Sequence, residues 1–150
     1  MKLLYRTPIK IFLLYPLITL IFEVIIKRGA IRFHPFFLLL MLWGYVQYRW
    51  CGRYRVKFGG GGPGLEKPPE RLVSTGLYAY TRNPMYLSLI IFLIGLTLTL
   101  SSWLGAFITI ANAVWFHTRV RLDEQQLALQ MGEPYLRYVQ SVSRWIPGVF

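Results

Sequence analysis

The sequence predicts an all-α membrane protein with four transmembrane helices, including a short helical hairpin, followed by cytoplasmic amphipathic helices at the C-terminal end. Three observations favour this fold class. Hydrophobic residues make up 55% of the 150 residues and aromatic residues 17%, which exceeds the usual composition of a soluble domain. Long apolar runs alternate with polar segments. Lysine and arginine collect in the polar segments that would share one side of a membrane.

The first two apolar runs predict spans at residues 9–26 and 33–50. A helix needs about 20 residues to cross the hydrocarbon core of a bilayer, and both runs come close to that length. Pro16 and Glu23 interrupt the first run. Such residues are tolerated in a span when they face other helices rather than lipid. We therefore expect the first span to pack against neighbouring helices.

The third apolar run extends from Met85 to residue 117 and is too long for one crossing. Ser101 and Ser102 lie near its middle. We predict two short spans, at residues 85–100 and 102–117, that form a tight hairpin around these serines.

The distribution of positive charge predicts the orientation. Of the 17 lysine and arginine residues, all but Lys27, Arg28 and Arg32 lie before the first span, around segment 51–84 or after the fourth span. Cytoplasmic segments of membrane proteins carry the excess of these residues. We expect a multi-pass protein of a bacterial or archaeal cytoplasmic membrane, with both termini inside. The net charge of +11 then reflects topology and attraction to anionic membrane lipids rather than nucleic-acid binding.

The segment 51–84 is the one long polar loop predicted between spans. Its GGGGPG run, residues 59–64, disfavours a helix, and no Lys-Ser or Lys-Thr follows it as a phosphate-binding P-loop would require. The run is therefore either a flexible connector or a mobile flap that closes over a bound cofactor. The single Cys51 can form neither an internal disulfide nor a metal site by itself, so we expect no metal.

The C-terminal region, residues 119–146, predicts two amphipathic helices. Tyr135, Tyr138, Val142 and Trp145 recur at spacings of three and four, which places them on one side of the second helix. Helices of this kind can lie on a membrane surface, and that reading stays open.

Charged residues open this region. Arg119 and Asp123 are four residues apart and predict an ordinary helical ion pair. Glu124 has no such partner, because the residue four positions earlier is the apolar Val120. We therefore expect Glu124 to serve function, and a Glu124→Ala variant to lose donor binding or turnover while it still inserts and folds.

An ordered set of motifs now supports a family resemblance. RLVSTGLY at residues 71–78 precedes RNPMY at residues 82–86, and the predicted hairpin follows. The set then ends with residues of the C-terminal region. These are Arg119, Glu124, Leu127, Gly132, Tyr135, Tyr138 and Pro147. The pattern resembles the superfamily of isoprenylcysteine carboxyl methyltransferases and phospholipid methyltransferases, which are integral membrane enzymes. Many relatives have histidine where this chain has Asn83, which can still donate and accept hydrogen bonds.

The resemblance implies S-adenosylmethionine as the methyl donor and a lipophilic acceptor taken from the bilayer. Leu72 and Val73 would line the adenine, and Gly76 would allow close approach. Arg119 would orient an anionic acceptor, and Glu124 would hold the cofactor or accept a proton. The remaining cofactor wall would consist of Tyr78, Arg82, Asn83, Pro84 and Tyr86.

Pro84 carries a separate physical expectation. Proline suits the first turn of a helix, where its missing N–H needs no partner. We predict that Pro84 begins the third span, and that the free N–H groups there suit the carboxylate of a bound donor.

Alternatives stay open at this point. Membrane sterol reductases that use NADPH share a similar Arg-(Asn/His)-Pro-X-Tyr signature, although the short chain and four spans argue against them. A non-catalytic membrane module is the third possibility. The sequence does not distinguish a prenylated cysteine, a phospholipid headgroup or a small hydrophobic thiol or acid as acceptor. We expect a lipidic acceptor to enter laterally from the bilayer.

Overall fold

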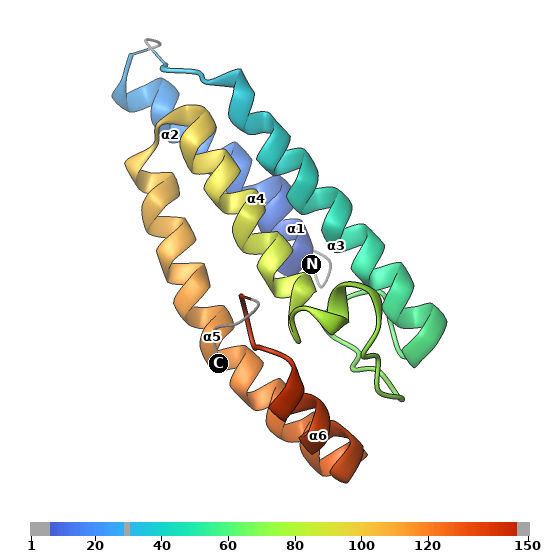
Figure 1. The fold of residues 1–150 in the computed structure, drawn as a ribbon. Coiled ribbons are helices and arrows are strands. Elements are labelled where there is room, and N and C mark those ends of the chain that lie inside the picture. Colours follow the sequence, from blue (N-terminus) through green and yellow to red (C-terminus); the bar gives the residue numbers. More distant parts are fainter. Residues whose placement is uncertain (1–6, 29–30, 147–150) are drawn as a thin grey trace. The chain divides into compact units, whose positions relative to one another are not determined.

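The computed structural model describes residues 7–28 and 31–146, and all regular structure within them is helical (Figure 1). The all-α prediction is thus confirmed for this part of the chain. Pro147, the last residue of the sequence pattern, lies outside it. The elements are α1 (Thr7–Ile9), the π-helical η1 (Lys10–Leu14), α2 (Tyr15–Ile26), the 3-10 helix η2 (Pro35–Phe37), α3 (Leu38–Gly59), the 3-10 helix η3 (Gly76–Ala79), α4 (Pro84–Leu100), α5 (Trp103–Met131) and α6 (Glu133–Ser141).

The chain divides into two compact units. The first unit contains the described residues up to Val46 together with Ser88–Val114. The second contains Gln47–Leu87 and the described residues from Trp115 onward. All the candidate site residues belong to the second unit.

Only one helix in the described residues is long and apolar enough to cross a membrane. It runs through α1, η1 and α2 from Thr7 to Ile26, with a mean hydropathy of 2.3 in its most apolar window. The apolar helix α4 has 17 residues and is shorter. The prediction of four transmembrane helices is therefore not confirmed.

The second predicted span differs from the helix observed. α3 begins at Leu38 rather than at residue 33, because Pro35 lies in the separate 3-10 turn η2. α3 also continues to Gly59, nine residues beyond the predicted end at 50. Gly60 then adopts a left-handed φ of 73°, which glycine tolerates and which ends the helix. The hydropathy boundary thus marked a change of side-chain polarity and not the end of the helix.

The predicted hairpin turn is present between α4 and α5. Ser101 has a φ of 45°, and the Ser102 N–H donates to the Thr97 carbonyl at 3.1 Å. The Ser102 hydroxyl then accepts the Gly105 N–H at 3.1 Å, which is the arrangement of a serine N-cap. The two serines therefore close one helix and open the next.

The second arm of the hairpin is much longer than predicted. α5 runs without interruption to Met131, so the helix expected to begin at residue 119 is its continuation. No proline occurs within α5, and Gly132, with φ 63°, separates it from α6. α6 ends at Ser141, so Trp145 lies beyond the second amphipathic helix rather than on its face.

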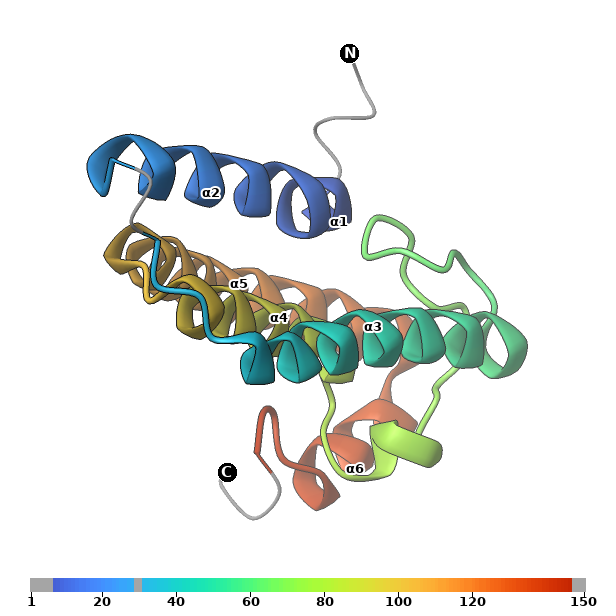
Figure 2. The same ribbon diagram turned by 90° about the horizontal axis from the view of Figure 1, so that it is seen from above.

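Close helix packing holds the first unit together. In Figure 2, α2 runs beside α4 and α5, and the ring of Phe22 meets Trp103 edge-on at 5.3 Å. Glu23 is fully buried, with its carboxylate 2.5 Å from the Lys27 ammonium. As predicted, this acidic residue faces other helices.

Glycine at position 44 sets the approach of α3 to α4. A Cβ atom at Gly44 would lie 2.6 Å from the Ser88 carbonyl oxygen and 2.7 Å from the Phe92 nitrogen. Both neighbours are backbone atoms, which cannot move aside as a flexible side chain could. The two helices can therefore pack this closely only when residue 44 has no side chain.

We predict that Gly44→Ala destabilises the protein by about 1–3 kcal/mol, because the added methyl group overpacks a backbone contact. Thermal unfolding in detergent measures the effect. Val46→Ala is the control, since Val46 lies on the same helix but is exposed. Equal unfolding midpoints for the two variants would contradict the close contact.

Candidate functional site

The segment Arg82–Pro84 leads directly into α4. Pro84 is the first residue of that helix, as predicted from its missing N–H. Arg82 donates its backbone N–H to the Ser143 carbonyl at 2.9 Å, and the Thr81 hydroxyl donates to the Arg144 carbonyl at 3.0 Å. The segment is thus fastened to residues that follow α6.

Glu124 is the centre of a buried polar network. The Asn83 amide donates to Oε1 at 3.0 Å, and the Arg82 Nε lies 3.4 Å from the same oxygen. Arg144 donates to Oε2 through Nε at 3.1 Å and Nη2 at 2.9 Å. Glu124 thus has no partner four residues earlier in its own helix, as expected, but it has partners elsewhere in the chain. Spacing along one helix could not reveal partners that come from two other segments.

Asp123 forms a second polar pair beside this network. Arg119 donates through Nε to Asp123 Oδ1 at 3.1 Å, which confirms the predicted pair. The Tyr86 hydroxyl donates to the other carboxylate oxygen at 2.6 Å. The hydrogen bond and charge of Asp123 raise the pKa of Arg119 above its usual value, so its guanidinium stays charged. Its side chain is nevertheless 46% exposed.

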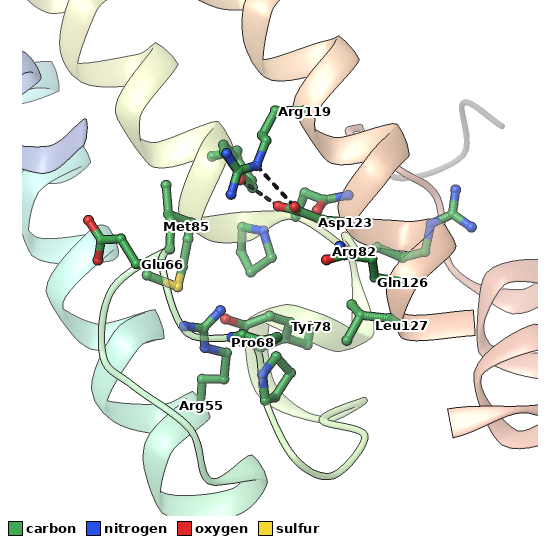
Figure 3. A pocket seen from close by; sticks show the side chains of 15 residues that line it. Arg55, Glu66, Pro68, Tyr78, Arg82, Met85, Arg119, Asp123, Gln126 and Leu127 are labelled. Carbon is green, nitrogen blue, oxygen red and sulfur yellow. Dashed lines mark hydrogen bonds and ion pairs between the residues drawn. The ribbon is translucent and has the colours of Figure 1, made fainter. Parts of the chain in front are cut away.

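A pocket with two adjoining chambers lies among these residues. The larger chamber has about 690 Å³ of empty space, part of it open to solvent, and the smaller about 420 Å³. Figure 3 shows that α3, the loop after it, the start of α4, and α5 all supply its lining. Both chambers are lined by Arg55, Pro69, Tyr78, Arg82, Asn83, Asp123 and Leu127.

The structure brings the predicted site residues together, with one exception. Leu72, Val73 and Glu124 line the smaller chamber. The larger chamber includes Pro84, Tyr86 and Arg119, and both include Tyr78, Arg82 and Asn83.

Gly76 is the exception, because it lines neither chamber. Its φ is 63°, and an added Cβ would lie 3.0 Å from the ring of Tyr54. Glycine is therefore required here for conformation and space. Gly76 begins η3 with a left-handed φ, and its missing side chain leaves room for the Tyr54 ring. The resemblance implied that Gly76 lets the cofactor approach closely, whereas the group that approaches Gly76 in this structure is the ring of Tyr54.

Sequence reasoning missed Arg55. Its side chain is buried, and Nη2 donates to the carbonyls of Gly62 at 2.7 Å and Lys67 at 3.0 Å, and also to that of Gly64. The glycine run is thus tied to α3 rather than being an unattached connector. Arg55 is one of several basic residues in segment 51–84, whose positive charge was used to predict membrane topology. Nothing in the neighbouring sequence distinguishes Arg55 from the others.

Sequence reasoning also missed the role of Arg144. It was counted with the residues that favour cytoplasmic placement, whereas its guanidinium binds Glu124. The spacing between the two residues is 20, which no helical periodicity connects.

α6 contributes Tyr135 and Tyr138 to the wall of the smaller chamber. Tyr135, Tyr138 and Val142 form a buried cluster, so Val142 joins the predicted face although it follows the helix. The Tyr138 hydroxyl donates to the Tyr78 carbonyl at 2.5 Å. Burial raises the pKa values of Tyr135 and Tyr138, and both phenols therefore remain protonated donors at neutral pH. Apolar neighbours of this cluster are Leu72, Leu127, Ala128, Met131 and Val139.

The fold and the site define a class: an α-helical protein with one long apolar helix and a pocket lined by buried charged residues. Residues 35–131 match the family of phospholipid methyltransferases, and the chain belongs to that family. The family consists of membrane methyltransferases, so methyl transfer is the class of activity that membership supports. No curated protein gives a significant match. The matched segment ends at residue 131, so α6 and Arg144 lie beyond it.

Glu124→Gln tests the polar network. We expect it to destabilise the protein by about 3–5 kcal/mol, because the buried guanidinium of Arg82 and the partly exposed one of Arg144 would lose their counterion. This replaces the expectation that a variant at Glu124 folds normally. Denaturant unfolding in detergent gives the measurement.

Glu133→Gln is the matched control, since its ion pair with Arg137 is exposed on both sides and surface pairs contribute about 0–1 kcal/mol. If both variants unfolded at the same denaturant concentration, Glu124 would not hold the network together.

Proposed function

We propose that this protein transfers a methyl group from S-adenosylmethionine to a lipophilic acceptor that partitions into the membrane. The acceptor atom would belong to the carboxylate of an isoprenylcysteine-like molecule or to a lipid headgroup. Family membership supports methyl transfer. A structural observation adds to this support. The residues expected to bind the donor, except Gly76, line one pocket.

The chemistry of the pocket fits such a donor. Leu72, Leu127 and Met131 give the smaller chamber an apolar wall suited to a purine ring. The buried Tyr78 hydroxyl and Arg82 Nε lack hydrogen-bond partners within the described residues, and buried polar atoms normally have one. When bound, the donor supplies a methyl group on a positively charged sulfur.

The contribution of the protein would be mainly positioning. Methyl transfer is an in-line displacement, and holding two reactants in line can supply much of the acceleration. Both carboxylate oxygens of Glu124 are engaged by arginine and asparagine donors. We therefore assign Glu124 the fixing of Asn83 and Arg82 in the pocket wall, in preference to the removal of a proton.

The nature of the acceptor decides whether a base is needed. A carboxylate acceptor has no proton to lose, whereas a protonated amine must lose one before it can attack. Asp123, which lines the pocket, already accepts hydrogen bonds from Tyr86 and Arg119. The engagement of Asp123 and Glu124 favours an acceptor that is already deprotonated when it reacts.

Calorimetric titration of the detergent-solubilised protein tests donor binding directly. We expect S-adenosylhomocysteine to bind and NADPH not to bind. Asn83→Leu should weaken S-adenosylhomocysteine binding by about tenfold or more, because it breaks a buried hydrogen-bond network, which costs about 1–3 kcal/mol.

Asn112→Leu serves as the control, because the hydrogen bond that the Asn112 amide donates within the described residues stays in its own helix, to the Ile108 carbonyl at 2.8 Å. Binding of NADPH without S-adenosylhomocysteine would instead indicate a reductase, and binding of neither would indicate a non-catalytic module.

Acceptor chain length provides a second test, since we propose that the acceptor reaches the site from the bilayer. Each additional buried methylene should improve apparent affinity by about 0.8 kcal/mol. The maximal rate should change far less, because uniform binding by a remote tail does not lower the chemical barrier. A homologous series of acceptors at fixed mole fraction in micelles gives both quantities. Equal efficiency with short water-soluble acceptors would contradict entry from the membrane.

A further inference from the structure

We propose that Arg55 and Tyr78 together form an oxyanion-binding site inside the pocket. The ligand group is a carboxylate or a phosphate diester, supplied either by the methyl donor or by the headgroup of the acceptor. The inference deepens the proposed function and rests on it for the identity of these two molecules. It assigns a binding role to Arg55, which the sequence pattern does not include.

The first observation is the unbalanced charge of Arg55. Arg55 is 8% exposed. It forms no ion pair within the described residues, whereas Arg82, Arg119 and Arg144 are each paired with a carboxylate. Glu66 lines the larger chamber as well, but it is exposed and lies beyond ion-pair distance of Arg55. A buried cation is costly unless an anion or hydrogen-bond acceptors compensate it.

The hydrogen bonds of Arg55 satisfy only some of the N–H donors of its guanidinium. Nη2 donates to the three loop carbonyls, which explains how Arg55 holds the glycine run. Nε is buried and has no acceptor within the described residues. Anchoring of the loop therefore accounts for one nitrogen and leaves another donor unused.

Tyr78 supplies a second unused donor. Its residue is also 8% exposed, and its hydroxyl has no hydrogen-bond partner within the described part of the chain. Arg55 and Tyr78 line the same two chambers, and Figure 3 shows their side chains next to each other at one end of the pocket. The Tyr78 backbone is fixed by the hydrogen bond from Tyr138.

An oxyanion satisfies both residues at once. A guanidinium N–H and a phenol O–H can donate to the oxygens of one carboxylate or phosphate, and such charge-assisted hydrogen bonds are about twice as strong as neutral ones. Burial raises the pKa of Tyr78 above its usual value, although the charge of Arg55 opposes this effect. The phenol is therefore protonated at neutral pH and available as a donor.

Arg119 is less suited to binding an oxyanion, although the family resemblance implied that it orients an anionic acceptor. Its charge is balanced by Asp123 and its side chain is about half exposed, so water screens what remains. Arg55 has neither a carboxylate partner nor much contact with water. The anionic part of a ligand should therefore be held mainly at the Arg55 end of the pocket.

Tyr78→Phe is the decisive variant, because it removes one hydroxyl that forms no hydrogen bond within the described residues and leaves the ring in place. Tyr80→Phe is its control, since Tyr80 lies nearby but is 65% exposed. Arg55→Gln, with the exposed Arg53→Gln as control, removes the charge but also loosens the loop. Unfolding midpoints measured for all four variants separate loss of binding from loss of structure.

Two pairs of ligands distinguish the sources of the oxyanion. S-adenosylhomocysteine carries a carboxylate that 5′-methylthioadenosine lacks, and dihexanoylphosphatidylethanolamine carries a phosphate that dihexanoylglycerol lacks. We expect Tyr78→Phe to weaken binding of the oxyanion-bearing member of one pair by about tenfold or more, the equivalent of a hydrogen bond to a charged group. Binding of the member that lacks the oxyanion should stay unchanged. The affected pair identifies the donor or the acceptor as the source.

The site would be refuted if Tyr78→Phe bound all four ligands as Tyr80→Phe does, or if it weakened the neutral and anionic members equally. Wild-type protein that binds the phosphatidylethanolamine but not S-adenosylhomocysteine would contradict the proposed methyl donor and still allow the phosphate comparison to test this site. Failure of the wild type to bind either anionic ligand would refute the oxyanion site itself.

Discussion

The pocket depends on one buried carboxylate. Glu124, which is 8% exposed, would be strongly destabilising in isolation, because a charge removed from water needs opposite charges and hydrogen bonds around it. Its compensation comes from Arg82 and Asn83, which precede α4, and from Arg144, which follows α6. The carboxylate can therefore be buried only when two segments far apart in sequence are assembled against α5. Folding of the second unit and formation of the pocket are consequently one event.

This requirement explains why the C-terminal residues matter to a site whose family match ends earlier. The carbonyls of Ser143 and Arg144 accept hydrogen bonds from Arg82 and Thr81, so the backbone supports the same junction as the side chains. Tyr138 extends the support to Tyr78. Residues 132–146 thus complete the wall of a pocket whose other residues lie within the matched segment.

The sequence was informative where a property is local. The Ser101 and Ser102 turn, Pro84 at the start of α4 and the Arg119–Asp123 pair all depend on neighbouring residues, and the structure contains them. Hydropathy was less informative about helix ends, because α5 crosses from apolar to charged residues without a glycine or proline to stop it. Family resemblance located most of the pocket lining, which composition and periodicity could not. The partners of Glu124 and the part played by Arg55 depend on contacts between distant segments, and no spacing rule encodes those.

The charges in the pocket have a further consequence for its chemistry. Asp123 and Glu124 are engaged by arginine, asparagine and tyrosine donors, and these pairs are already formed in the folded protein. Groups held in this way cost little reorganisation when a reaction redistributes charge beside them. They are also poorly placed to exchange protons, because each carboxylate would have to abandon existing partners. A site built from closed ion pairs favours alignment of reactants over acid–base catalysis. Among the described residues that line both chambers, Arg55 Nε and the Tyr78 hydroxyl are buried donors with neither a hydrogen bond nor an ion pair. Under the proposed function, recognition of the ligand's oxyanion would therefore fall to Arg55 and Tyr78, while the carboxylates hold the pocket in shape.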